Sequence, residues 1–160
     1  MVKYYLGNLW YIETESQLER KFTASHELFH ILYLKYILND DYSKRIVWYD
    51  EGMAQFMSGE KDYLNDRNDF ELFYKKVNEK TRRIPILNDI EYGKLFCNDD
   101  YNGYELCYLA VRYLSEILSS NDFKELIYKF DEIKKIGNDV ANKMFTYYDC
   151  KFNYNKKMNK

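Results

Sequence analysis

Cysteine, proline, glycine and histidine are all scarce in this chain of 160 residues, and these shortages exclude several classes of structure. The three cysteines include no C-x-x-C pair, so the sequence predicts neither a disulfide framework nor a cysteine-based metal site. One proline and six glycines leave long stretches without a helix breaker. No apolar run approaches the roughly 18 residues that a membrane span needs. The remaining sequence favours helices.

An excess of charge of one sign is also missing. The 24 basic and 26 acidic residues are interspersed and give a formal net charge of −2, so no field is present to attract nucleic acid or an anionic membrane. The N-terminus lacks the apolar stretch of a signal peptide, which predicts a cytoplasmic protein. The length predicts a single domain over residues 1–160, because such a chain can bury one core but not two.

The only two histidines of the chain stand four residues apart in the sequence HELFH. On an α-helix, four residues advance about 400° and about 6 Å, so the imidazoles of His26 and His30 leave the same face. Both rings can then bind one Zn²⁺, and Glu27 lies beside them, where it can act on a metal-bound water. The spacing therefore predicts two metal ligands and a general base.

The flanking sequence supplies the helix that this arrangement needs. Thr14 or Ser16 can act as the N-cap, with Gln17 or Glu19 three residues later as the partner in a capping box. Neither glycine nor proline interrupts the chain from there to Leu38, and apolar residues recur at helical spacing. We expect one side of this helix to belong to the core.

A third ligand is required, because a catalytic zinc site holds three protein groups and a water molecule. After a polar break, the sequence WYDEGMA places Glu51 21 residues beyond His30. This distance allows the first helix to end and a second helix, from about Trp48 to Ser58, to bring the carboxylate back to the metal. Gly59 is expected to end that second helix.

HExxH followed at this spacing by W-x-x-E-G-x-A resembles the gluzincin metallopeptidases, in particular the aminopeptidase N-like and peptidase MA-like branch. The resemblance implies one zinc per chain, bound by His26, His30 and Glu51, with Glu27 as the general base. A weaker likeness continues to about residue 150. It includes Tyr104, which matches a tyrosine facing the active site and would serve as a catalytic donor to the oxyanion. A core or capping role for this tyrosine is the alternative.

The N-terminal part departs from that family. Aminopeptidases carry a G-x-M-E-N-like motif before HExxH, and residues 1–25 contain no match, so aminopeptidase activity is not implied. Those residues are also too few for the mixed sheet that zincin domains place there, although residues 3–12 (KYYLGNLWYI) predict a strand or a short hairpin. The expected fold is mainly α, a helical zincin-like domain with that strand or hairpin at residues 1–13, and α+β is the alternative.

Three classes of function are compatible with these features. The first is a zinc metallopeptidase acting on a peptide or protein substrate. The second is a catalytically silent zincin-fold module for interaction or regulation, which would not need Glu27. The third is a helical protein without metal, for which Glu51 would be a coincidence. Asp50 and Gln55 either orient the ligand imidazoles or serve at the surface and in helix pairing.

The rest of the chain is predicted to be helical, with one long connector. Charged and apolar residues alternate as in amphipathic helices, and Pro85 with several Asn, Asp and Gly residues marks the connector. The expected segments are a helix over 66–78, the connector over 82–102 with one helical turn, a central helix over 104–119, a helix over 123–130 capped by Asn121 or Asp122, a helix over 138–148, and a frayed tail over 151–160.

Overall fold

The computed structural model describes residues 3–6, 9–12, 17–59, 70–91 and 99–158. The protein is mainly helical, which confirms the predicted fold class. Its helices are α1 (Gln17–Leu32), α2 (Val47–Ser58), α4 (Phe70–Lys80), α5 (Gly103–Ile117), α6 (Ser120–Leu126), α7 (Phe130–Ile136) and α8 (Val140–Met158). Three shorter helical segments connect them, η1 (Tyr33–Ile37), η2 (Tyr42–Lys44) and η3 (Leu87–Asp89).

The described N-terminal residues form a short hairpin, one of the two arrangements predicted there. Strands β1 (Lys3–Leu6) and β2 (Leu9–Ile12) pair antiparallel, with Lys3 opposite Ile12 and Leu6 opposite Leu9. A two-stranded hairpin cannot cover a helical domain as a full sheet does. The predicted ligands are therefore positioned by helix packing.

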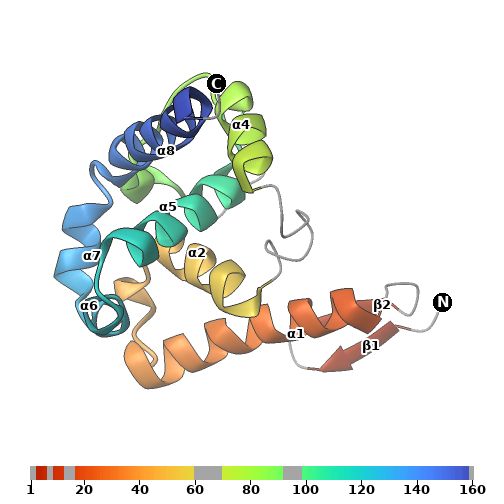
Figure 1. The fold of residues 1–160 in the computed structure, drawn as a ribbon. Helices are drawn as coiled ribbons and strands as arrows, with labels where there is room; N and C mark the ends of the chain where they lie inside the picture. Colours follow the sequence, from red (N-terminus) through yellow and green to blue (C-terminus); the bar gives the residue numbers. More distant parts are fainter. Residues whose placement is uncertain (1–2, 7–8, 13–16, 60–69, 92–98, 159–160) are drawn as a thin grey trace.

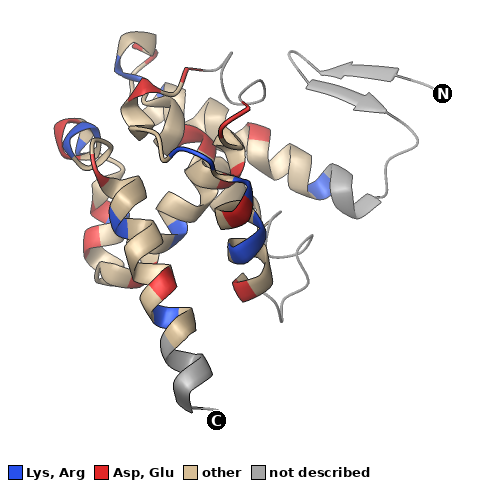
Figure 2. Cartoon of the chain, turned by 90° about the horizontal axis from the view of Figure 1, so that it is seen from above, with Lys and Arg blue, Asp and Glu red and all other residues tan. Residues whose placement is uncertain are grey.

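Helix α5 occupies the centre of the molecule, with α2 on one side and α4 and α8 on the other, while α1 lies along the outer side of α2 (Figure 1). Large apolar side chains from these helices form the core. The fully buried ones include Trp48, Tyr49, Tyr74, Leu106, Tyr108, Leu109, Met144 and Tyr148. Basic and acidic residues are interspersed along the described helices and connectors (Figure 2). None of the described helices is both long and apolar enough to cross a bilayer.

The ends of the two motif-bearing helices lie where the sequence predicts them. Helix α1 continues through η1, and the chain then turns at Asn39 and Asp40, whose φ angles of 52° and 60° are left-handed. Asparagine and aspartate tolerate this region better than other residues with a side chain. Gly59 ends α2 with a φ of 72°, as expected of a glycine at this position. The predicted caps Thr14 and Ser16 lie outside the described residues.

Gly52, within the second motif, allows α2 and α5 to approach closely. A Cβ atom at this position would lie 2.4 Å from the carbonyl oxygen of Cys107 and 2.7 Å from Cγ2 of Val111. Both distances are far shorter than a van der Waals contact. The absence of a side chain at Gly52 thus brings the backbone of α5 against the turn of α2 that carries Glu51.

The tryptophan of the second motif anchors α2 to the connector. Trp48 is fully buried, and its Nε1 donates to Oδ1 of Asn88 at 3.1 Å. Asn88 belongs to η3, the single helical turn predicted within 82–102, and the backbone N of Leu87 donates to the carbonyl of Gly137 at 3.1 Å. These bonds join α2, the connector and the corner between α7 and α8.

The C-terminal half differs from the prediction in its boundaries. The cap is Ser119, whose hydroxyl accepts from the backbone N of Asp122 at 3.1 Å, so the predicted caps at Asn121 and Asp122 are wrong. A single helix is predicted over 123–130. The structure instead has two helices here, because α6 ends at Leu126 and α7 begins at Phe130.

The final helix is longer than the sequence suggested. Helix α8 runs on to Met158, through most of the segment 151–160 that was expected to fray. Phe152 explains the extension, because it is buried and stacks on Tyr148 with the ring centroids 5.8 Å apart. The spacing of four residues between these two rings keeps both on the core face of one continuous helix.

Candidate metal centre

The structure brings the three predicted ligands together. His26 and His30 lie one turn apart on α1, with ring centroids 4.8 Å apart, and Glu51 approaches them from α2. One ligand atom from each residue lies within 4.8 Å of the ligand atoms of the other two. The helical period of α1 places the two histidines on one face, and the packing of α2 on α1 brings the Glu51 carboxylate to them.

The separations suit a metal ion better than hydrogen bonds. Nε2 of His26 lies 3.5 Å from Oε2 of Glu51, and Nε2 of His30 lies 3.6 Å from Oε1. A hydrogen bond between such atoms would be about 2.7–3.2 Å long. Two ligands of a tetrahedral zinc, each about 2.0–2.1 Å from the metal, are about 3.3 Å apart. The three residues therefore fit the group that the motifs imply.

The donor set also selects the kind of ion. Two imidazoles and one carboxylate are typical of catalytic zinc sites, whereas Mg²⁺ and Ca²⁺ prefer sites made of oxygen atoms. All three residues also lie away from open solvent, with Glu51 buried and the two histidine side chains 14% exposed. Three protein ligands are also the number that a catalytic zinc uses, which leaves its fourth position to water.

Asp50 fixes the tautomer of His30. Oδ1 of Asp50 lies 2.8 Å from Nδ1 of His30. Because an ionised carboxylate can only accept, Nδ1 carries the hydrogen and the lone pair of a neutral His30 is on Nε2, the atom that faces Glu51. Of the two roles considered for Asp50, orientation of a ligand imidazole is the one that the contacts favour.

Gln55 takes the other role considered for it, helix pairing. Its Nε2 donates to the carbonyl of Glu51 at 3.1 Å and to the carbonyl of Tyr104 at 3.0 Å. Both partners are backbone oxygens, and one of them belongs to α5. Gln55 therefore ties the turn that carries the third ligand to the first turn of the central helix.

The buried polar and charged side chains that the structure describes lie on α2. Among the residues whose burial the structure describes, the buried polar or charged ones are Asp50, Glu51 and Gln55. Burying a carboxylate is costly unless it is paired or binds a metal, so two adjacent buried acids are a strong sign of a functional site.

Tyr104 lies beside this site. Burial, followed by the nearby carboxylate of Glu51, raises the pKa of the Tyr104 phenol to about 12, and the charges of Cys107 and Glu27 act in the same direction. The phenol therefore stays protonated at neutral pH and can donate a hydrogen bond. The charge of Glu27, which is half-buried on α1, is thus one of those that act on the Tyr104 phenol.

Arg45 is the contact that sequence reasoning missed. Its Nε donates to Oδ2 of Asp50, on the opposite edge of the carboxylate from His30. A buried Asp50 needs a cationic partner, and the sequence offers two adjacent candidates, Lys44 and Arg45. Helical periodicity does not indicate which of these two side chains faces Asp50. Nothing in the spacing could distinguish the two basic residues.

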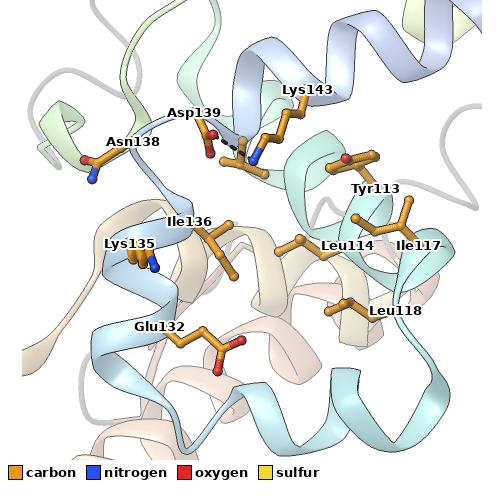
Figure 3. Close-up of a pocket in the computed structure, with 11 residues that line it drawn as sticks. Tyr113, Leu114, Ile117, Leu118, Glu132, Lys135, Ile136, Asn138, Asp139 and Lys143 are labelled. Atoms are coloured by element: carbon orange, nitrogen blue, oxygen red, sulfur yellow. Dashed lines mark ion pairs between the residues drawn. The ribbon is translucent and has the colours of Figure 1, made fainter.

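A separate cavity of about 580 Å³ lies between α5 and the α7–α8 corner. Its floor is apolar, and at one end Nζ of Lys143 pairs with Asp139 at 2.7 Å (Figure 3). The lining residues include none from the two motifs. The cavity is thus distinct from the metal centre.

No protein family model, curated protein or solved structure matches this chain. The function of this chain must therefore be inferred from the two motifs and from the positions of the side chains that they supply.

Proposed function

We propose that this protein is a zinc-dependent peptidase with His26, His30 and Glu51 as the metal ligands. The observation that carries the proposal is the convergence of these three side chains, at separations of 3.5 and 3.6 Å between the imidazole and carboxylate atoms. The retained Glu27 favours catalysis over a structural metal site, because a structural zinc would have no use for a free carboxylate beside its ligands.

Zinc, when bound, would supply a Lewis acid that polarises a substrate carbonyl and lowers the pKa of water toward neutrality. Glu27 is the residue that would accept a proton from that water and pass it to the leaving amine. The hydroxyl of Tyr104 would donate to the carbonyl oxygen as negative charge develops there. Asp50 would keep the His30 ring in the tautomer that leaves Nε2 available.

The metal content of the protein tests the proposal directly. We expect about one zinc per chain in protein prepared without chelators, measured by elemental analysis. Glu51→Ala should weaken zinc binding by more than the roughly 10–100-fold that is typical of outer-shell changes, because it removes one of three ligands. Glu132→Ala removes the same charge from an exposed position of α7 and serves as the control. Wild-type protein that binds no transition metal would refute the proposal.

A second prediction concerns the phenol of Tyr104 as the donor to the carbonyl oxygen. Tyr104→Phe should lower the rate of peptide hydrolysis by about 100-fold or more, because loss of one oxyanion donor has an effect of this size. Zinc content should not change. Tyrosine ordinarily ionises near pH 10, and burial raises the pKa of the Tyr104 phenol further, so its donor function should persist from pH 7 to pH 9. Wild-type and Tyr104→Phe rates, measured over this pH range, should keep a constant ratio, and equal rates for the two proteins would exclude the role.

A further inference from the structure

The segment before α2 places a cation behind one of the candidate ligands. Nε of Arg45 donates to Oδ2 of Asp50, and Oδ1 of the same carboxylate accepts from Nδ1 of His30 at 2.8 Å. These contacts form a chain from the guanidinium to the imidazole. At its far end, Nε2 of His30 faces Glu51 at 3.6 Å.

The burial of these groups shows why the cation is needed. The side chain of Asp50 is only 1% exposed, whereas that of Arg45 is 24% exposed. A buried carboxylate that loses its counterion is strongly destabilising. Arg45 can compensate this charge while part of its own side chain stays exposed to solvent.

The geometry of the guanidinium also restrains the carboxylate. Nη2 of Arg45 lies 3.4 Å from Nδ1 of His30, and since Nδ1 donates to Asp50, this is a close approach of two donors and not a hydrogen bond. Oδ2 of Asp50 is occupied by Nε of Arg45, so Oδ1 is the oxygen left to face the imidazole. The rigid, planar guanidinium holds Nε in one direction and so restrains this orientation, which the rotatable ammonium of lysine would not.

We propose that Arg45 is a positioning residue of the metal site, which orients the Asp50 carboxylate and, through it, the His30 ring with Nε2 toward the metal. This inference rests on the proposed zinc site and extends it to a residue outside both motifs. Arg45 approaches the Nδ1 side of the His30 ring, opposite the ligand atom Nε2, so its effect should appear in metal affinity and not only in turnover.

The test compares two neighbouring basic residues. Arg45→Gln should weaken zinc binding by about 10–100-fold, the usual effect of losing an outer-shell partner. Lys44→Gln removes the same charge one residue earlier, where the ammonium pairs with the exposed Asp41 at 3.2 Å, and should leave the affinity within about twofold of wild type. The dissociation constant is measured by competition with a chromophoric chelator, on the full chain with added zinc.

A double-mutant cycle with Asp50→Asn separates positioning from general damage to the fold. If Arg45 acts through Asp50, Arg45→Gln should cost much less affinity in the Asp50→Asn background than in wild type. Equal costs in the two backgrounds would overturn the inference. So would wild-type affinity in Arg45→Gln, while a wild-type protein that binds no zinc would instead refute the proposed function itself.

A conservative variant covers the case in which Arg45→Gln does not fold. Arg45→Lys keeps the charge but loses the planar fork, so we expect folded protein with zinc binding weakened by several-fold, toward the lower end of the roughly 10–100-fold range. Circular dichroism of the metal-free protein reports the fold independently. Full wild-type affinity in folded Arg45→Lys would show that charge alone suffices and would overturn the positioning role.

Discussion

Glu27→Gln is expected to lower peptide hydrolysis by about 100-fold to 10,000-fold, the range that a positioned general base contributes. Glutamine has nearly the same shape as glutamate but cannot accept the proton. Glu27 lies between the two histidines on α1, is half-buried, and its charge acts on the Tyr104 phenol. The rate should be measured as cleavage of an unstructured protein by purified wild type and variant at pH 7.5.

The zinc content of Glu27→Gln is the control for this result. Glu27 is not among the three converging ligands, so the variant should still bind about one zinc per chain. Loss of both zinc and activity would show that Glu27 supports the site structurally. Unchanged cleavage, with zinc retained, would mean that another group or a contaminating enzyme does the chemistry.

The second large effect is expected at Gly52. In an ordinary helix interior, replacing glycine by alanine stabilises the protein by up to about 1 kcal/mol. Here the new Cβ would lie 2.4 Å from the Cys107 carbonyl oxygen, so α2 and α5 must move apart. We expect Gly52→Ala to lower the free energy of unfolding by about 3 kcal/mol, the upper range for overpacked cores, as measured by urea denaturation.

An exposed position on the same helix provides the comparison. Met57 is 61% exposed, so Met57→Ala should change stability by no more than about 0.5 kcal/mol. Gly52→Ala should also weaken zinc binding, because Glu51 must follow the displaced turn. A Gly52→Ala protein as stable as wild type would show that α5 can move away at Cys107 without a loss of free energy of unfolding.

Sequence alone was enough for the parts of the site that depend on regular helix geometry. The i, i+4 spacing of His26 and His30 fixes their common face once α1 is helical, and no tertiary information is needed. The return of Glu51 could also be predicted, because polar residues after Leu38 allow a turn and Gly59 ends the second helix. Both predictions used strong local signals.

Tertiary contacts decide the remaining features. Asp50 could have faced solvent on α2, and only the packing of that helix against α1 brings it to His30. Arg45 lies in an irregular segment, where side-chain direction cannot be read from periodicity. The extension of α8 likewise depends on Phe152, which is buried against Tyr148, although lysine and asparagine dominate the surrounding sequence.

The two hydrogen bonds of Gln55 link the two helices that carry Glu51 and Tyr104 through a single side-chain amide. It spans the gap between the backbone of α2 at Glu51 and that of α5 at Tyr104, with donor–acceptor distances of 3.1 and 3.0 Å. The separation of the two backbones at Glu51 and Tyr104 is therefore bridged by the length of one side chain. Any shift of α5 along or away from α2 must lengthen or break one of these bonds.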